Sequence, residues 1–400
     1  MAFFSTRLER IKLSPSTAAT QKARELRQAG HDIIALTIGQ PDFNTPDHVK
    51  QAVADALERN ETKYPPVDGI APLKEAVREK FKKENDLDYG LDQIMIGTGS
   101  KQIIFNAIMS TIDAGDEVII PAPYWISYLD MVLVCEGVPK EVLCTEHSGF
   151  KLTAQQLEAA ITDRTKWLLL NSPNNPTGAV YSREELRALA DVLLRHPHVW
   201  VLTDDIYEHL RFDRLPFYTI AQVEPALYER TLTVNGVSKA YAMTGFRLGY
   251  AGGPMQLIRN IIKLQSQSTA GVSSISQWGA VAALRGPQDF IPQRAKAFEE
   301  RRDRVLEWFQ TIPGLQPNHP EGAFYLFVRC ADLLGLKTKQ GVVIDSEQAV
   351  VLHLMNHGVA VVNGAAYGMS PYFRMSIATE LKNLEQACVR IRRAVMELTK

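Results

Sequence analysis

Lys239 and Arg247 are the two cations around which the chemistry of this sequence can be built. They stand in the stretch S-K-A-Y-A-M-T-G-F-R-L-G-Y, which follows the apolar and β-branched run Thr231 to Val234. Such a run predicts a buried strand, so the amine of Lys239 comes just past a strand end, where it can condense with an aldehyde in a cleft. Gly245 and Gly249 let the backbone approach a ligand closely. A fixed amine near a fixed guanidinium indicates a ligand with both a carbonyl and a phosphate.

A loop lysine and a loop arginine are more often solvated charges than parts of a site. The longer pattern S-K-x-x-x-M-T-G-x-R-x-G-Y is more specific than the pair. It resembles the lysine region of the class I aminotransferases, which are pyridoxal-phosphate enzymes of fold type I. The resemblance implies that Lys239 forms the internal aldimine with pyridoxal 5'-phosphate and shuttles the substrate's α-proton, and that Arg247 binds the cofactor's phosphate.

A glycine turn opens the first predicted strand-to-helix unit. The strand Gln93 to Ile96 leads into Gly97-Thr98-Gly99-Ser100-Lys101 and then into an apolar-periodic helix. Free N–H groups and the positive end of the helix dipole at such a turn suit a phosphate. Glycine turns of this kind are common, so the turn gains weight from its position in the family's order. The resemblance implies that Gly99, Ser100 and Lys101 bind the cofactor.

Trp125 follows the next predicted strand, Glu117 to Ile120, in P-A-P-Y-W. An aromatic ring at a strand's carboxyl end can stack on a planar ligand. A tryptophan packed in the core is the alternative interpretation. The resemblance assigns Trp125 to the face of the cofactor and to the substrate site.

The run N-S-P-N-N-P-T-G after the predicted strand Lys166 to Leu170 is the most family-specific short match in the chain. Its prolines stiffen the loop, so that the amide of Asn175 can point inward and donate to a ring oxygen and to a carboxylate. Ser182 and Glu185 then form a predicted capping box, with the helix after it buried along a leucine face.

Two adjacent carboxylates follow the predicted strand Trp200 to Thr203, in D-D-I-Y. A carboxylate that faces a pyridine nitrogen favours the protonated ring, which withdraws electrons from the carbon that loses its proton. Either aspartate could do this on chemistry alone. The family's D-x-x-Y spacing selects Asp204 for the nitrogen and Tyr207 for the ring oxygen, and leaves Asp205 spare.

Arg374 lies in the apolar run Y-F-R-M-S-I, so its guanidinium needs an anion or an exit to water. A structural salt bridge and a clamp for the α-carboxylate of an amino acid satisfy this equally well. The family's pattern of a glycine followed by F-R-x-S favours the carboxylate clamp, with Asn175 and the backbone at Gly39 beside it.

Substrate choice is expected to depend on Lys101 and on the N-terminal arm. The resemblance implies that a lysine after the phosphate turn binds a substrate's distal carboxylate, and Lys101 takes that position. Lys12 and Ser16 match residues that line the same end in related enzymes, and Lys12 is associated there with prephenate. No motif matches the distal-carboxylate arginine that other aspartate aminotransferases receive from the partner subunit.

Two positions depart from the family's pattern. Gln40 stands where a glutamate often follows the glycine at 39, which leaves the charge at the mouth of the site open. Gly236 stands where many relatives carry a phosphate-binding serine, and Ser238 is expected to serve instead.

Tyr64 is predicted to be exposed in a proline-rich loop, K-Y-P-P-V-D-G, that cannot be regular secondary structure. The resemblance implies that this loop reaches the cofactor phosphate of a neighbouring subunit. A homodimer is therefore expected.

Composition excludes several classes of function. The chain of 400 residues has 44 basic and 45 acidic residues, so no net field favours nucleic acid or an anionic membrane. It has no run as long as the ~18 apolar residues of a membrane span, and no secretory signal. The four cysteines lack C-x-x-C spacing and histidine partners, so we expect no metal, buried thiols and a cytoplasmic protein.

The predicted fold is α/β: a large domain with a mostly parallel sheet flanked by helices, plus a smaller α/β domain. We place the N-terminal arm and part of the small domain at 1–46, the large pyridoxal-phosphate domain at 47–285, and the small C-terminal domain at 286–400. The groups in the turns after the predicted strands, from Ser100 through Trp125 and Asn175 to Asp204, follow the carboxyl ends of those strands, where open parallel sheets bind ligands.

The sequence predicts an aminotransferase that moves an amino group between aspartate or glutamate and the 2-oxo acids oxaloacetate or 2-oxoglutarate, similar to the bacterial Ib subgroup of aspartate aminotransferases. Prephenate or aromatic substrates on the same site are the main alternative. A pyridoxal-phosphate C–S lyase or decarboxylating synthase could share every cofactor residue. A cofactor-binding DNA sensor would need an additional DNA-binding module.

Overall fold

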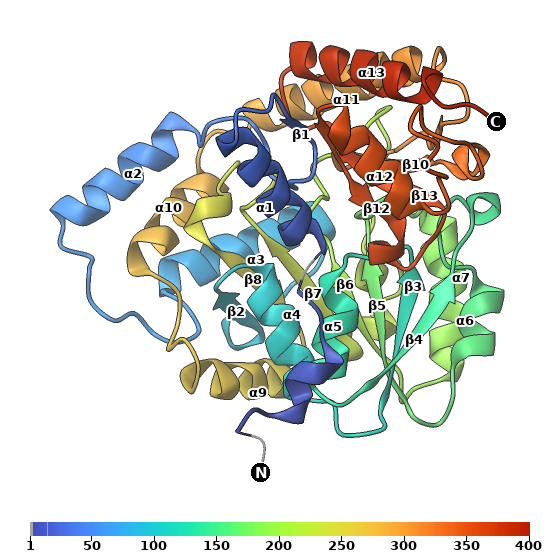
Figure 1. Ribbon diagram of the computed structural model, residues 1–400. Coiled ribbons are helices and arrows are strands. Elements are labelled where there is room, and N and C mark those ends of the chain that lie inside the picture. Colours follow the sequence, from blue (N-terminus) through green and yellow to red (C-terminus); the bar gives the residue numbers. More distant parts are fainter. Residues whose placement is uncertain (1–2, 14) are drawn as a thin grey trace.

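The computed structural model describes residues 3–13 and 15–400, and the side chain of Ser16 also lies outside the described part. A seven-stranded sheet with the order β2-β8-β7-β6-β5-β3-β4 forms its centre (Figure 1). The strand β8 is antiparallel to both of its neighbours, and the other pairings are parallel. The strands are β2 (Ile94–Gly97), β3 (Glu117–Ala122), β4 (Val138–Leu143), β5 (Thr165–Asn171), β6 (Trp200–Asp204), β7 (Thr231–Gly236) and β8 (Gly249–Gly252).

Helices cover both faces of this sheet. The helices α4 (Ser100–Met109), α5 (Ser127–Val134) and α9 (Met255–Ser266) pack with one set of strand residues. The other face carries α3 (Ala71–Asn85), α6 (Ala154–Ala160), α7 (Arg183–Arg195), α8 (Ile220–Val223) and α10 (Ser274–Arg285), and α2 (Asp47–Glu58) packs on α10.

The central strands β5, β6 and β7 are buried along nearly their whole length because both faces are covered. In β5, for example, Trp167 and Leu169 join the core on the α4 side, whereas Leu168 and Leu170 join the core on the α7 side. This period of two leaves the carboxyl ends of the strands as the places where polar side chains can face a ligand.

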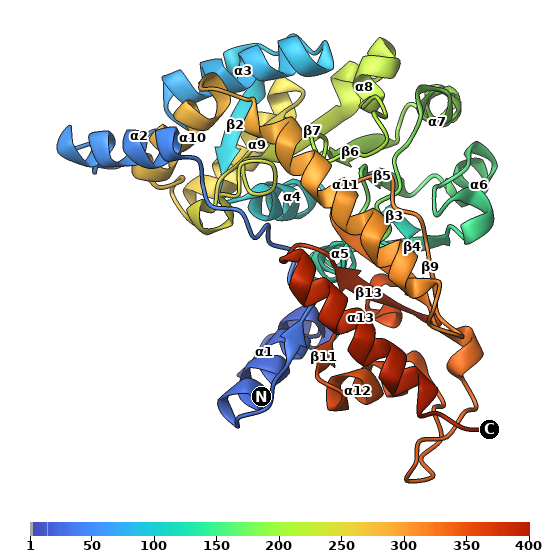
Figure 2. The ribbon, with the colours of Figure 1, turned by 90° about the horizontal axis from the view of Figure 1, so that it is seen from above.

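A second layer contains the four-stranded sheet β12-β13-β10-β9 and the parallel pair β1–β11. Its strands are β1 (Ile34–Ala35), β9 (Gln316–Pro317), β10 (Tyr325–Arg329), β11 (Val359–Ala360), β12 (Val362–Asn363) and β13 (Tyr372–Ser376), and its helices are α1 (Pro15–Gln28), α11 (Phe290–Phe309), α12 (Glu347–Asn356) and α13 (Leu381–Met396). Figure 2 shows the long helix α11 running between this layer and the large sheet, with α1 and α12 on the far side.

The α/β fold with a mostly parallel sheet is confirmed. In the small layer, two runs whose composition favours strands, 31–38 and 322–327, form strands over only part of their length. The run 31–38 contributes only the two residues of β1, because its partner β11 pairs over two residues. The run 322–327 becomes a strand only at Tyr325, because Ala323 has a φ of 60°, which is incompatible with an extended strand. The domain limits at 46 and 285 stay a prediction.

Several local predictions are confirmed. Ser182 and Glu185 form the capping box of α7, and the predicted leucine face of that helix is buried. All four cysteines are free and buried. Among the described helices, none combines the length and the apolar character that crossing a membrane requires.

Candidate active site

A cavity of about 540 Å³ opens where β2, β3, β5, β6 and β7 reach their carboxyl ends. Ligands bind at this edge in open α/β sheets because the backbone turns there leave side chains and N–H groups free. Most residues that the sequence singled out line this cavity: Gly39, Gly99, Ser100, Lys101, Trp125, Asn175, Asp204, Tyr207, Ser238, Lys239, Arg247 and Arg374.

Three of the predicted residues are not placed there. Lys12 is exposed and does not line the cavity. Tyr64 is 96% exposed on the loop after α2 and lies outside the cavity of its own chain. The side chain of Ser16 lies outside the described residues.

Lys239 follows β7 and points its amine across the cavity. Its Nζ donates to the backbone oxygen of Gly39 at 2.6 Å and lies 5.5 Å from the centre of the Tyr207 ring. Desolvation, reinforced by the positive charge of Arg374, lowers the pKa of Lys239 to about 8, although Asp204 opposes this shift. About a tenth of the amine is therefore neutral, and nucleophilic, at pH 7.

Asp204 ends β6 and is 4% exposed. Its Oδ2 accepts a hydrogen bond from the Tyr128 hydroxyl at 2.8 Å, whereas its Oδ1 has no partner among the described residues. Burial raises the pKa of Asp204 to about 6 against the effects of Tyr128 and Lys239. Because Asp204 also lines the cavity, this buried oxygen can face a donor atom of a bound ligand.

The choice between the two adjacent aspartates agrees with the geometry. Asp205 does not line the cavity, and its Oδ1 accepts from the hydroxyl of Thr203 at 2.5 Å. Asp204 alone of the pair faces the site, as the D-x-x-Y spacing predicted.

The opposite end of the cavity is suited to a phosphate. The ten-residue helix α4 begins at Ser100 after Gly99, which has a φ of 76° and provides no side-chain cap, so the first N–H groups stay available. A Cβ on Gly99 would lie 2.6 Å from Nη2 of Arg247, so only glycine lets the guanidinium come this close to the turn. Arg247 donates to the oxygen of Thr244 at 3.1 Å and keeps its other donors for a ligand.

Gly236 departs from the family's serine for a visible reason. A Cβ at this position would lie 3.1 Å from the Oγ of Ser100 and 3.0 Å from the oxygen of Leu248, so a side chain would crowd the phosphate turn. Ser238 is buried and lines the cavity, as expected of a replacement.

Arg374 is 3% exposed and, within the described residues, has no carboxylate partner. Its Nη1 donates to Oδ1 of Asn175 at 3.0 Å, its Nη2 donates to the oxygen of Thr37 at 2.6 Å, and its Nε has no partner. A structural salt bridge, the alternative left open by the sequence, is therefore absent from this part of the chain. A buried guanidinium held only by neutral oxygens suits a carboxylate ligand.

Asn175 is fixed by its own loop. Its backbone N–H donates to Oδ1 of Asn171 at 2.8 Å, and Nδ2 of Asn171 donates to the oxygen of Asp204 at 2.7 Å. With its Oδ1 turned toward Arg374, the Nδ2 group of Asn175 is left to donate to a ligand.

Lys101 and Trp125 form a further part of the wall. The Nζ of Lys101 lies 5.1 Å from the centre of the Trp125 ring. Desolvation and the nearby charge of Arg247 lower the pKa of Lys101, although Asp130 raises it. A cation over the aromatic ring places positive charge at the outer end of the cavity.

The helix α1 and Tyr325 also line the cavity, although the sequence motifs did not single them out. Thr17, Gln21 and Arg24 line the cavity, and their spacing of four and three residues, which sets them on one helix face, could have indicated this. The hydroxyl of Tyr325 lies 2.9 Å from that of Tyr207, and its ring lies 4.4 Å from the Arg374 guanidinium. A Cβ on Gly39 would meet the Tyr325 hydroxyl at 2.1 Å, so glycine is required there.

The residues present fit the pyridoxal phosphate that the resemblance implies. The unpartnered oxygen of Asp204 can face a pyridine nitrogen, Lys239 can reach an aldehyde, and the turn at Gly99 with Arg247 can hold a phosphate. These three features demand a ligand with one donor nitrogen, one carbonyl and one anionic group.

Comparisons with known proteins agree with this donor set. A family model described as "Aminotransferase class I and II" matches residues 31–391. A probable aspartate/prephenate aminotransferase of Rhizobium leguminosarum bv. phaseoli is 53% identical over 394 residues, which cover 98% of both chains.

Solved structures are similar over the same extent. The crystal structure of the aspartate aminotransferase from Rhizobium meliloti is similar with a TM-score of 0.97 and 52% identity over the whole of both chains. The aspartate aminotransferase from Thermus thermophilus with maleate is similar with a TM-score of 0.92 and 40% identity, over 98% of this chain and 100% of that one.

Proposed function

Because the chain belongs to the class I and II aminotransferases, we propose that it transfers the amino group of aspartate or glutamate to oxaloacetate or 2-oxoglutarate. The enzyme is an aminotransferase, and its cofactor is pyridoxal 5'-phosphate. The observation that carries the proposal is the placement of Lys239, Asp204 and Arg374 around one cavity, with an oxygen of Asp204 that has no partner among the residues the structure describes.

Pyridoxal phosphate, when bound, supplies a ring that withdraws electrons from the substrate carbon that loses its proton. Asp204, buried and hydrogen-bonded by Tyr128, would hold positive charge at the ring nitrogen. Trp125 would stack on the ring, and Tyr207 and Asn175 would donate to its oxygen. Gly99, Ser100, Ser238 and Arg247 would bind the phosphate.

Lys239 would hold the cofactor between turnovers and carry the α-proton during them. Its pKa, lowered by desolvation to about 8, suits a base that must both accept and release a proton near neutral pH. Arg374 would bind the α-carboxylate, with Asn175 and the backbone at Gly39 beside it, and so orient the α-hydrogen toward the amine.

The charge of the cavity favours dicarboxylic substrates. Among the described residues that line it, Arg24, Lys101, Lys239, Arg247 and Arg374 are basic, whereas Asp204 is the acidic one. The cofactor's phosphate would neutralise part of this excess positive charge, and a substrate with a second carboxylate would neutralise more of it. We assign the distal carboxylate to Lys101, and the Thermus relative was solved with maleate, itself a dicarboxylate.

A second substrate, prephenate, is favoured by the polar face of α1. Prephenate also carries two carboxylates, and Thr17, Gln21 and Arg24 give the entrance side of the cavity additional polar groups. Relatives of this chain carry the name aspartate/prephenate aminotransferase. Lys12, which the resemblance associates with prephenate, and Ser16 stay part of this proposal. A panel of oxaloacetate, prephenate and phenylpyruvate as competing acceptors would rank the substrates.

A half-reaction separates the aminotransferase from a lyase. Aspartate added to the holoenzyme, without an acceptor, should bleach the cofactor's absorption band and release one oxaloacetate per site. A thioether amino acid such as cystathionine should give no pyruvate and ammonia. Repeated turnover to pyruvate, ammonia and a thiol would support the lyase instead.

We also propose that the enzyme is a homodimer in which Tyr64 completes the neighbouring site. Tyr64 belongs to the loop that follows α2, and its side chain is 96% exposed. Figure 1 shows the end of α2 and the loop after it at the edge of the chain. An exposed aromatic side chain with a hydroxyl is suited to a contact with another chain. The partner's phosphate site is the expected destination.

Mixed dimers test this assignment. Chains with Tyr64→Ala and chains with Lys239→Ala should regain activity when combined, because one site of the mixed dimer then receives both an intact Tyr64 and an intact Lys239. If Tyr64 acted in its own chain, no site of the mixed dimer would be intact and the mixture would stay as inactive as its components.

The cytoplasmic location also stays a proposal. It is supported by the four cysteines, which are all buried and unpaired, as is typical of proteins in a reducing compartment. Labelling of the protein in fractionated cells would test it.

A further inference from the structure

A buried ion pair lies behind the catalytic cavity. Lys80 of α3 is 5% exposed and Glu208 is 3% exposed, and the Lys80 ammonium pairs with Oε1 of Glu208. Asn235 near the end of β7 donates from Nδ2 to the same oxygen at 2.7 Å. We call Lys80, Glu208 and Asn235 the Glu208 chain. None of its members lines the cavity.

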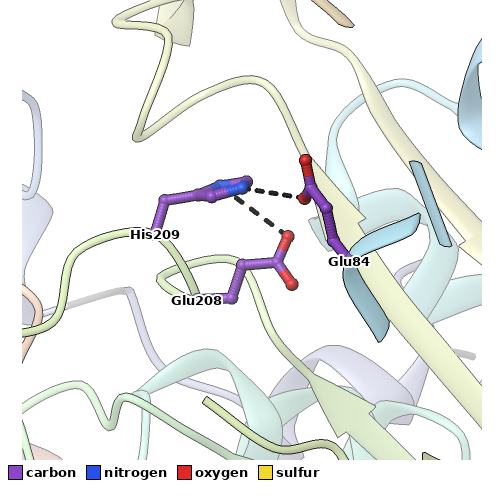
Figure 3. A group of neighbouring side chains, drawn as sticks. All are labelled: Glu84, Glu208 and His209. Atoms are coloured by element: carbon purple, nitrogen blue, oxygen red, sulfur yellow. Dashed lines mark hydrogen bonds and ion pairs between the residues drawn. The ribbon is translucent and has the colours of Figure 1, made fainter. Parts of the chain in front are cut away.

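The side chains next to this ion pair resemble a metal site, but the ammonium of Lys80 already occupies the place of the cation. Glu84, Glu208 and His209 place one ligand atom each within 4.8 Å of one another (Figure 3). The Nζ of Lys80 pairs with Glu208 and also lies 3.6 Å from Oε2 of Glu84. A divalent ion at this position would have to displace a buried lysine from its carboxylates, so we infer no metal.

Stability alone does not account for a buried ion pair. The desolvation of two charges offsets most of their attraction, and apolar side chains of similar volume often stabilise a protein as well or better. The carboxylate of Glu208 is nevertheless held in its charged form by its neighbours. Burial would raise the pKa of Glu208, but Lys80, His209 and the hydrogen bonds of Asn85 and Lys80 lower it to about 2.

The position of Glu208 suggests what the charge does. The ladder between β6 and β7 ends at the pair Asp204 and Val234, after which the two strands separate. Glu208 lies one residue after Tyr207 and closes the turn with its N–H, which donates to the oxygen of Asp205 at 2.9 Å. The hydrogen bond from Asn235 to Glu208 therefore connects the segment at the end of β7 with the turn after β6, just past the last residue pair of the ladder.

Asn235 links three parts of the site. Through Glu208 it is joined to the turn that carries Asp204 and Tyr207. Its backbone oxygen accepts from the Oγ of Ser100, in the phosphate turn, at 2.9 Å. Four residues further along the chain stands Lys239.

We propose that the Glu208 chain is a positioning device that sets the place of Lys239 relative to Asp204. The proposal rests on the function assigned above, because it concerns the same two groups. The ionised carboxylate makes the bond from Asn235 charge-assisted, and Lys80 anchors that carboxylate to α3 on the far side. These are positioning residues, since they act through Lys239 and Asp204 and do not touch the ligand.

Asn85 offers a matched control. Like Asn235, it is buried and donates from Nδ2 to Glu208, at 2.9 Å to Oε2. It belongs to α3, however, and within the described residues its side chain makes no hydrogen bond to β7. Asn85→Ala removes this bond and also the Oδ1 that accepts from the Lys80 ammonium at 2.7 Å, but it leaves the bond from Asn235 to Glu208, which leads to Lys239, in place.

The test compares Asn235→Ala, Glu208→Gln and Asn85→Ala as holoenzymes. Asn235→Ala should lower kcat by about tenfold or more and change KM by less than about threefold. It should also raise, by about half a pH unit, the pH midpoint at which the bound cofactor's absorption band changes, because a loosened loop admits water to the nitrogen of Lys239. Glu208→Gln keeps a hydrogen-bond acceptor but loses the charge. It should therefore also lower kcat and raise the pH midpoint, each by less than Asn235→Ala does.

Asn85→Ala should leave kcat and the absorption midpoint unchanged while it lowers the free energy of unfolding. The proposal is overturned if all three variants lose activity only in proportion to their loss of unfolding free energy and keep the wild-type midpoint. If Asn235→Ala does not fold, the comparison of Glu208→Gln with Asn85→Ala in kcat and in the absorption midpoint tests the proposal instead. If the wild type forms no oxaloacetate from aspartate, the proposed function fails, but the midpoints still test the positioning.

Discussion

The two sides of the cavity are built in different ways. On the cofactor side, Ser100, Asn175, Asp204 and Lys239 follow the ends of β2, β5, β6 and β7, and the backbone behind them is paired in the large sheet. On the entrance side, Thr17, Gln21 and Arg24 project from α1, a helix at the edge of the small layer (Figure 2).

The burial of the two sides differs in the same way. Asp204 and Asn175 are 4% and 5% exposed, whereas Gln21 and Arg24 are exposed. We propose that the chemistry is fixed where the sheet holds the backbone, and that exposed side chains of α1 contribute to substrate choice. This contrast predicts that substitutions on the cofactor side lower activity strongly with every substrate. Substitutions at the entrance should change activity less, and by an amount that depends on the substrate.

The largest effect is expected for Lys239→Ala. Without the amine there is no group at this position to accept the α-proton, so kcat should fall by more than about 10⁴-fold with every substrate. Equilibrium dialysis should still detect phosphate-dependent binding of the cofactor, because Arg247 and the turn at Gly99 are intact. A variant with normal kcat would refute the assignment.

Arg374→Ala should come next. Removing a buried partner of a substrate carboxylate should lower kcat/KM by an amount equivalent to about 2–5 kcal/mol of activation free energy. The loss should be similar for aspartate and for aromatic amino acids. Arg302→Ala is the matched control, because Arg302 is also buried but pairs with Asp213 away from the cavity. That control should lower the melting temperature and leave kcat/KM near the wild-type value.

Lys101→Ala is expected to discriminate between substrates. If its ammonium binds the distal carboxylate, kcat/KM for dicarboxylic substrates should fall by an amount equivalent to about 1.5–3 kcal/mol of activation free energy. For aromatic substrates kcat/KM should stay unchanged. Equal losses for both substrate classes would mean that Lys101 serves only the cofactor.

The pH dependence of cofactor capture sharpens the account of Lys239. Because the pKa of Lys239 is lowered to about 8, the neutral amine dominates above that pH, and capture by the cofactor-free protein should accelerate through a midpoint near 8. Arg374→Gln removes a positive charge that lowers this pKa, so the midpoint should move upward. Stopped-flow absorbance would measure it, and a midpoint near 10 in the wild type would contradict the desolvated environment.

The smallest effect is expected for Arg24→Ala. An exposed ion pair contributes about 0.2–1 kcal/mol, so kcat/KM for dicarboxylic substrates should fall a few-fold at most, and less at high salt. A loss as large as that of Arg374→Ala would erase the contrast between the two sides of the cavity.

The residues at the sheet edge of the cavity could be singled out from the sequence because strand ends carry local signatures. A buried strand followed by a glycine or proline turn and a polar residue indicates Ser100, Asn175, Asp204 and Lys239 as candidates, and the resemblance to the family's motifs supplied the role expected of each. The choice of Asp204 over Asp205 came from the family's D-x-x-Y spacing, and of the two aspartates only Asp204 lines the cavity.

The entrance side could not be predicted in the same way. Which face of α1 meets the cavity depends on how that helix packs on the small layer, and the hydrogen bond between Tyr325 and Tyr207 joins segments far apart in the sequence. The Glu208 chain was missed for the same reason, since Lys80, Glu208 and Asn235 meet only through the tertiary fold. Lys12 was carried over from the family, but its side chain lies outside the cavity.

Reduction of the holoenzyme with borohydride, followed by digestion and mass spectrometry, tests the central claim most directly. The account predicts a single phosphopyridoxyl group on the peptide that contains Lys239, in the amount of one per chain. Attachment to Lys101, which lines the same cavity and also has a lowered pKa, or the absence of any attached group, would contradict it.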